Sequence, residues 1–172
     1  MKINTNSWNK IRYTILIPVY DLIAGYFKES RKKSVDALEI KVGDKVLIVG
    51  AGTGLDLAFL PNDCEIVATD ITPAMIELIK KRSSTSNRRV QAIVMDGQRL
   101  EFADNSFDKI ILHLILAVIP DPIACIKESE RVLKPGGHIV VFDKFVRRDT
   151  KPSILRRVAN LFTNLIFTDI TR

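Results

Sequence analysis

Short apolar runs alternate with amphipathic segments along the middle of the chain. Five of these runs, rich in β-branched residues and short for helices, are predicted to be strands: Val46–Val49, Glu65–Asp70, Arg89–Asp96, Phe107–Leu116 and His138–Phe145. Helical segments separate the runs, and crossovers between parallel strands are right-handed. We therefore predict a doubly wound α/β fold with a mostly parallel sheet, whose ligand lies at the carboxyl ends of the strands.

Turn residues mark where the predicted helices begin and end. One helix starts with Thr72 as its N-cap and Pro73 in its first position, and another begins at Pro122. Residues 55–60 allow one helical turn or slightly more before a proline stops it. Near the N-terminus we expect two helical pieces, because Pro18 interrupts the apolar pattern.

A single domain accounts for the 172 residues. Within it we expect an N-terminal helical cap over residues 1–40, a core over 41–145 and a basic amphipathic C-terminal helix over 146–172. The composition, 47% apolar and 27% charged, is that of an ordinary globular protein. Cys64 and Cys125 lack the spacing of metal ligands, so we expect reduced core thiols in a cytoplasmic protein and no metal site.

Basic charge gathers at the two ends of the chain. Residues 1–45 carry 9 basic and 5 acidic side chains, residues 46–143 carry 10 and 13, and residues 144–172 carry 7 and 2. Both ends are also rich in apolar residues, a combination that suits an acidic or amphiphilic partner, such as an anionic membrane surface bound peripherally. A solvated helix face has the same composition, so both interpretations stay open.

The run KVLIVGAGTG places three glycines, Gly50, Gly52 and Gly54, directly after the first predicted strand. A dinucleotide-binding loop has glycine in the third slot of G-x-G-x-x-G, where this chain has Leu55. The Lys and Ser or Thr of a phosphate-binding loop are absent from the sequence at this place. Asp70 ends the second strand, where an acid binds ribose hydroxyls in both dinucleotide and adenosyl cofactors.

Five spaced blocks distinguish between these cofactors: VLIVGAGTG, VATDITPAMIE, VMDGQRLEFADNSFD, LHLILAVIPDP and RVLKPGG. In these blocks, which lie within residues 36–145, the sequence resembles the class I S-adenosylmethionine (SAM) dependent methyltransferases. It is most similar to their quinone and phospholipid subgroup, which includes the phosphatidylethanolamine N-methyltransferases. The segments YDLIAGYF and FTDITR also resemble that subgroup.

The resemblance implies a role for each matching residue. Asp70 would accept hydrogen bonds from the ribose diol, and Asp96 with the backbone of Gly97 would lie at the adenine amino group. Ile71 and Met75 would pack on the adenine face, while the glycine backbone would approach the ligand closely. The residues expected to bind SAM are Gly50, Ala51, Gly52, Gly54, Asp70, Ile71, Met75, Asp96, Gly97 and His113.

His113, in the fourth predicted strand, is the candidate catalytic residue, since the resemblance implies a place beside the sulfonium of SAM. A histidine on an apolar strand is more often a core residue, so a structural role stays open. Asp56 follows the glycines and is expected to be a surface acid favoured by a helix dipole. Tyr13 and Tyr20 could close over the cofactor or pack in the core.

Together these features predict a SAM-dependent methyltransferase for a small or amphiphilic acceptor, such as a phospholipid head group or a quinone precursor. The class builds seven strands, so we expect a C-terminally truncated form whose fifth strand has an open edge that permits self-association. A SAM-binding remnant without catalytic activity is therefore an alternative, and an NAD(P)-dependent oxidoreductase is a less favoured third. Nucleic acid is not expected, because no aromatic stacking platform follows the fourth strand.

Overall fold

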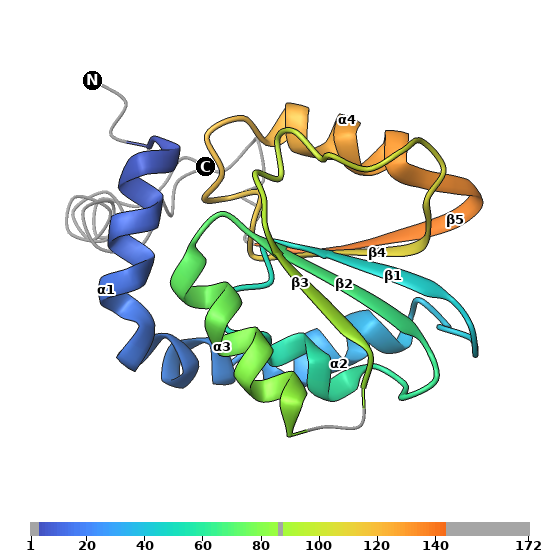
Figure 1. The fold of residues 1–172 in the computed structure, drawn as a ribbon, viewed down its shortest axis with the longest axis horizontal. Helices are drawn as coiled ribbons and strands as arrows, with labels where there is room; N and C mark the ends of the chain where they lie inside the picture. Colours follow the sequence, from blue (N-terminus) through green and yellow to red (C-terminus); the bar gives the residue numbers. More distant parts are fainter. Residues whose placement is uncertain (1–3, 86–87, 144–172) are drawn as a thin grey trace, which may run out of the picture.

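The computed structural model describes residues 4–85 and 88–143. It shows a central sheet with α4 on one face and α2, α3 and the short helix η1 on the other (Figure 1). The elements in chain order are α1 (Asn6–Gly25), α2 (Lys28–Asp36), β1 (Lys45–Val49), η1 (Leu55–Phe59), β2 (Glu65–Asp70), α3 (Pro73–Ser84), β3 (Val90–Val94), β4 (Phe107–His113), α4 (Pro122–Val132) and β5 (Leu133–Phe142).

The five strands form one parallel sheet in the order β3-β2-β1-β4-β5. Strand β1 lies at its centre, with Val46 opposite Ile66 of β2 on one side and Lys109 of β4 on the other. From β1 the chain first adds β2 and β3 on one side of the sheet and then β4 and β5 on the other, so the strand order switches between β1 and β4. Ligands of doubly wound folds bind at such a switch point. The predicted fold class is confirmed.

The side chains of the sheet alternate between two apolar layers, as expected of strands that are covered on both faces. Val46 and Ile48 of β1 pack with Val35 of α2 and Ile79 of α3. The other face contributes to a second cluster, whose buried members include Leu47, Val49, Phe107, Ile110, Cys125 and Val132. Both cysteines are buried free thiols, as predicted for the core.

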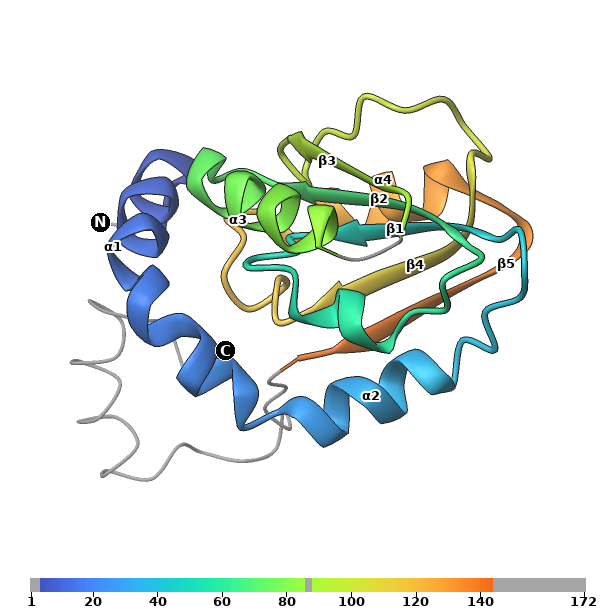
Figure 2. The same ribbon diagram turned by 60° about the horizontal axis from the view of Figure 1, so that its bottom comes forward.

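The N-terminal helix α1 lies across the carboxyl ends of the strands, and α2 then runs back along one face of the sheet (Figure 2). The prediction that Pro18 divides this region was wrong, because α1 is helical from Asn6 to Gly25. A proline removes one backbone donor, yet the turns on either side can keep their own hydrogen bonds. The break comes after Gly25, before α2 begins at Lys28.

Strand β2 has the predicted bounds, whereas β3 and β4 end earlier than predicted. Strand β4 stops at His113 because Leu114 has φ 57, in the left-handed region that a strand cannot contain. Strand β5 begins at Leu133, directly after α4 and five residues before the predicted start at His138. Its pairing with β4 is irregular between Phe107 and Lys109, where the longer β5 accommodates the glycines.

Within the described residues, β5 pairs with β4 alone and forms an edge of the sheet. The basic C-terminal helix predicted over 146–172 lies outside the described residues, as does the predicted end of the fifth strand. No helix in the described part of the chain is long and apolar enough to cross a membrane.

Candidate functional site

A cavity that opens to solvent lies at the carboxyl ends of the strands. Its walls come from the loops that follow β1, β2, β3 and β4, and from the N-terminal half of α1. Seven of the ten residues predicted to bind SAM line it: Gly50, Gly52, Asp70, Ile71, Met75, Asp96 and Gly97. The sheet topology therefore brings together residues that are up to 47 positions apart in the chain, from Gly50 to Gly97.

The glycine loop owes its shape to left-handed backbone conformations. Gly50 has φ 68 and Gly52 has φ 55, which side-chain-bearing residues rarely adopt. A Cβ atom on Gly50 would lie 2.5 Å from Cδ1 of Ile115, a cavity residue. Ala51 and Gly54 do not line the cavity, and a Cβ on Gly54 would instead meet Ile79 of α3 at 3.0 Å. The loop thus serves both the cavity and the packing of α3.

Asp70 is fixed at the end of β2 by two backbone donors. Its carboxylate accepts hydrogen bonds from the N–H of Gly52 at 2.9 Å and the N–H of Thr72 at 2.8 Å. Burial raises the pKa of Asp70, although both backbone hydrogen bonds oppose that effect. This carboxylate holds the glycine loop and the start of α3 together, and it faces a cavity in which it can accept hydrogen bonds from a ligand.

Asp96 follows β3 and is surrounded by side-chain and backbone donors. Gln98 donates to it from its backbone N–H and from Nε2, each at 2.9 Å to Oδ1, and Asn6 of α1 donates to Oδ2 at 2.6 Å. The Oε1 atom of Gln98 accepts the N–H of Asp121 at 2.8 Å, just before α4. Asp96 therefore connects the cavity with α1 and α4.

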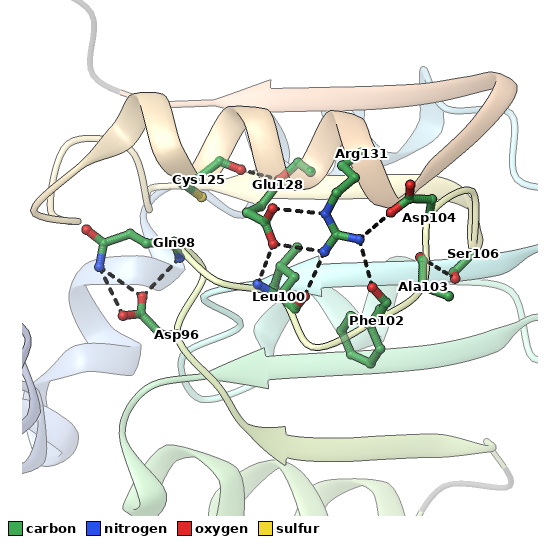
Figure 3. A network of polar contacts seen from close by, with 11 residues as sticks. Asp96, Gln98, Leu100, Phe102, Ala103, Asp104, Ser106, Cys125, Glu128 and Arg131 are labelled. Atoms are coloured by element: carbon green, nitrogen blue, oxygen red, sulfur yellow. Dashed lines mark hydrogen bonds and ion pairs between the residues drawn. The ribbon is translucent and has the colours of Figure 1, made fainter.

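The loop after Asp96 is attached to α4 by the side chains of Arg131 and Glu128 (Figure 3). Arg131 donates to the carbonyl oxygen of Leu100 at 2.7 Å and to that of Phe102 at 2.8 Å. Glu128 accepts the N–H of Leu100 at 2.8 Å and pairs with Arg131 at 2.9 Å. These contacts fix a long loop that would otherwise leave Asp96 poorly positioned.

Helix α1 forms the wall opposite the sheet. Asn9 donates to the carbonyl oxygen of Val118 at 3.0 Å, and Tyr13 lines the cavity one turn further along the helix. Burial raises the pKa of Tyr13, and the carboxylates of Asp70 and Asp143 act in the same direction while Arg12 opposes them. Tyr13 is therefore suited to donate a hydrogen bond and is a poor base.

His113 and Asp56 form a buried cluster away from the cavity lining. The Nδ1 atom of His113 lies 2.9 Å from Asp56, and Nε2 lies 3.0 Å from the hydroxyl of Ser34 in α2. Both ring nitrogens are engaged there, and His113 is not among the residues that line the cavity. The structure gives no geometric support to the predicted cofactor and catalytic roles of His113.

The prediction that Asp56 is a surface acid was wrong, because only 1% of its side chain is exposed. Arg31 of α2 binds both of its oxygens, at 2.9 and 2.8 Å. Burial opposes ionisation of Asp56, but the hydrogen bond with His113 and the charge of Arg31 outweigh it and lower its pKa. The contacts from Ser34 to His113 to Asp56 have the same sequence of residue types as the catalytic triad of serine hydrolases. Here, however, Arg31 already binds both oxygens of the Asp56 carboxylate, which indicates a structural cluster.

Several cavity residues were missed from the sequence. Asn6 and Asn9 belong to the region assigned only to a helical cap, and the segment after β4 contributes Leu114, Ile115, Val118 and Ile119. The positive φ of Leu114 ends β4 and starts this lining segment. A polar first turn of α1 was the available signal for Asn6 and Asn9, but sequence alone does not show which face meets the sheet.

Comparison with known proteins assigns the chain to a family. The methyltransferase domain family matches residues 47–141, from β1 through most of β5. The chain belongs to this methyltransferase family. The match decides against the NAD(P)-dependent oxidoreductase alternative and agrees with the SAM-dependent methyltransferase class that the sequence resembles.

Two curated methyltransferases illustrate the similarity. Demethylmenaquinone methyltransferase from Paenarthrobacter aurescens is 34% identical over 130 residues, which cover 72% of this chain and 50% of that protein. Phosphatidylethanolamine N-methyltransferase from Cereibacter sphaeroides is 26% identical over 152 residues, covering 86% of this chain and 74% of that protein. The chain spans about half the length of the demethylmenaquinone methyltransferases that it matches.

A solved structure shows the same fold at low sequence identity. The SAM-dependent methyltransferase from Aquifex aeolicus superposes with a TM-score of 0.60 at 21% identity, over 78% of this chain and 77% of that protein. The domain of this chain thus has the Rossmann-like fold of that structure, and doubly wound folds bind their ligands at the carboxyl ends of the strands, where the cavity lies.

The residues of the cavity fit the chemistry of SAM. The Asp70 carboxylate suits a ribose diol, and a second acid, Asp96, suits an exocyclic amine. Ile71, Met75 and Ile119 supply apolar surface for an aromatic ring. Two carboxylates in one cavity also favour a ligand that carries the positive charge of a sulfonium.

Proposed function

We propose that this methyltransferase domain transfers the methyl group of SAM to a small amphiphilic acceptor, either a quinone precursor or a phospholipid head group. The observation that carries the proposal is the cavity in which the glycine loop, Asp70 and Asp96 meet at the sheet's switch point. The two relatives named above act on acceptors of these two kinds, as their names state.

The chain's own residues orient the donor and exclude water. SAM supplies an electrophilic methyl group on a sulfonium, so displacement needs alignment of donor and acceptor more than acid–base chemistry. Asp70 and Asp96 are fixed by backbone and side-chain donors, which holds their oxygens in place before a ligand binds. Helix α1 covers this end of the sheet and places Asn6, Asn9 and Tyr13 on the cavity.

A direct assay tests the proposal. The full chain is incubated with methyl-labelled SAM and, in separate reactions, demethylmenaquinone or phosphatidylethanolamine in detergent micelles. We expect label in one of the two lipid products and its loss in Gly52→Val, where a β-branched residue would be placed at φ 55 in the cavity wall. Binding of S-adenosylhomocysteine (SAH) without transfer to either acceptor would contradict the proposed acceptor class.

We also propose that the domain meets its acceptor at an anionic membrane surface. Near the cavity, α1 exposes Ile11 by 55% and Ile15 by 70%, and Tyr26 after its end is 86% exposed. Exposed lysines lie beside these apolar residues, at Lys10 and Lys28. Exposed apolar and basic residues together suit insertion at an anionic interface.

Vesicle binding tests this second part of the proposal. We expect stronger binding to phosphatidylglycerol vesicles than to phosphatidylcholine vesicles, with the difference decreasing as salt increases. Ile15→Glu should weaken binding to the anionic vesicles. Val42→Glu is the matched control, because Val42 is 81% exposed but lies beyond α2, at the amino end of β1. Equal effects of the two variants would contradict a membrane-facing α1.

A further inference from the structure

Helix α1 carries two buried N–H donors that have no acceptor among the described residues: Nε1 of Trp8 and Nε of Arg12. The two residues are four positions apart, so they lie on one face of the helix, one turn from each other. A buried donor without an acceptor costs free energy, and buried polar groups in native proteins nearly always have partners. Two such donors one turn apart on the same helix are available to a ligand group that supplies acceptors, whereas the third unpaired donor, Nη1 of Arg31, belongs to a guanidinium already paired with Asp56.

The positive charge of Arg12 indicates which kind of ligand group can bind there. Arg12 is 8% exposed, and its hydrogen-bond partners are the neutral Asn9 Oδ1 at 2.9 Å and the Tyr13 hydroxyl at 3.4 Å. Its guanidinium also lies 4.8 Å from the centre of the Tyr13 ring. No carboxylate in the described part of the chain pairs with it. A buried cation without a counter-charge is unfavourable, so an anion is the fitting partner.

Arg12 lies next to the cavity, on the helix that forms one of its walls. Asn9 and Tyr13 line the cavity, and Arg12 contacts both of them from the adjoining face of α1. The acidic groups Asp70 and Asp96 belong to the opposite, sheet-side wall. The site therefore has an acidic wall, formed by Asp70 and Asp96 and suited to a cationic cofactor. It also has a basic corner, formed by Arg12 of α1.

We propose that Trp8 and Arg12 bind an anionic oxygen group, a phosphate or a carboxylate, of the methyl acceptor. The inference rests on the proposed function for the identity of the ligand, and on the unpaired donors for the existence of the site. A guanidinium binds such a group through paired N–H donors, and the neighbouring indole N–H adds one more. Arg12 is 8% exposed and does not line the cavity, so the proposal requires the anionic group to enter beside the lining residues Asn9 and Tyr13.

The chain offers a direct reporter for this site, since Trp8 is its single tryptophan. The full chain, first without and then with saturating SAH, is titrated with dihexanoylphosphatidylethanolamine, 4-hydroxybenzoate or inorganic phosphate at constant ionic strength. We expect a saturable change in Trp8 fluorescence with one of the two organic probes. A response to the phospholipid alone would assign a lipid phosphate to the site, and a response to 4-hydroxybenzoate alone would assign a carboxylate. Inorganic phosphate shows whether a free anion is sufficient for binding.

Variants decide whether Arg12 is responsible. Arg12→Gln should weaken probe binding at least tenfold, the scale of a hydrogen bond to a charged group. Arg12→Lys, which keeps the charge and loses the planar fork, should weaken it several-fold and serves if Arg12→Gln does not fold. Lys33→Gln is the matched control, since it removes an exposed positive charge of α2 that does not line the cavity. This control should bind the probes like the parent protein.

Three results would overturn the inference. The first is the absence of a saturable signal with all three probes, and the second is an equal loss of binding in Lys33→Gln, which would indicate an effect of overall charge. The third is a tenfold weakening of SAH binding in Arg12→Gln, which would assign the guanidinium to the cofactor. Failure of SAH to bind the parent protein would instead contradict the proposed function, while the probe titrations without SAH would still test the anion site.

Discussion

Two buried arginines, Arg31 beneath the sheet and Arg12 beside the cavity, have very different surroundings. Arg31 is 3% exposed and binds both oxygens of the buried Asp56, which in turn contacts His113. Arg12 is 8% exposed and has hydrogen-bond partners that are neutral. Each guanidinium keeps one nitrogen without an acceptor in the described residues, so the presence of a counter-charge is what distinguishes them.

The difference separates a structural cluster from a binding site. The Arg31 cluster joins α2, η1 and β4 through an ion pair and hydrogen bonds in which the charge of Arg31 is compensated by Asp56, so it needs no ligand. The Arg12 corner is incomplete within the described residues and adjoins a cavity. A buried charge near a cavity is therefore informative about function only after its partners have been identified.

Stability measurements give the largest expected effect. Removing one partner of a buried ion pair leaves the other charge uncompensated and costs about 3–5 kcal/mol. Asp56→Ala should therefore lower the free energy of unfolding by about that amount. Arg12→Met should change the free energy of unfolding of the ligand-free protein by less than about 1 kcal/mol, or raise it, because a charge without a counter-charge is removed.

Urea unfolding of both variants, without ligand, checks this contrast. A loss of stability in Arg12→Met as large as that in Asp56→Ala would show that Arg12 has an internal partner. It would also contradict the anion site, because the buried cation would then be compensated within the chain.

A smaller effect is expected at His113, which belongs to the structural side of the comparison. His113→Gln disturbs the hydrogen bonds to Asp56 and Ser34, so it should cost about 1–3 kcal/mol of unfolding free energy. Its dissociation constant for SAH should stay within about threefold of the parent value, since His113 does not line the cavity. Unchanged stability with a large loss of SAH affinity would restore the cofactor role predicted from the sequence.

Sequence reasoning succeeded where local chemistry decides the structure. The bounds of β2 follow from an apolar run that ends in Asp70, and the start of α3 follows from Thr72 and Pro73. The glycine spacing and the acids after β2 and β3 were sufficient to predict seven residues of the cavity lining. These positions depend on backbone geometry and on strand ends, both of which have local sequence signals.

The failures have a tertiary cause. Asp56 has the sequence of a surface acid, and its burial depends on Arg31, which lies 25 positions earlier in a different helix. His113 points to the same cluster because it lies two positions after Ile111 in β4, on the sheet face that packs against α2. Helix α1 continues through Pro18, and its cavity-facing residues could not be chosen without knowing how it lies on the sheet.

The smallest expected effect is a pH dependence of cofactor binding on the acidic wall. Burial raises the pKa of Asp70, so the folded, ligand-free protein holds this proton more tightly than the unfolded chain does. The stability that this group contributes is present at low pH and is lost as the pH rises through the raised pKa. A ribose diol donates to the ionised carboxylate, so SAH affinity should decrease as the pH falls toward that pKa.

Calorimetric titrations with SAH between about pH 7 and about pH 4.5 measure this dependence. The decrease should begin above the pH at which an ordinary aspartate, with a pKa of 3.8, titrates. Asp70→Asn provides the control, because it lacks the titrating carboxyl and should show a flatter profile. A parent profile as flat as that of the variant would contradict the assignment of the raised pKa to the binding site.

Calorimetric titration of SAH at neutral pH tests whether the cavity that holds Asp70 binds an adenosyl cofactor. The parent protein should bind one equivalent of SAH and should not bind NAD. Asp70→Ala should weaken SAH binding roughly tenfold to a few hundred-fold, because a hydrogen bond to a charged group contributes about 1.5–3 kcal/mol. Its circular dichroism should remain that of the parent. Equal SAH affinity in the parent and in Asp70→Ala would contradict the account.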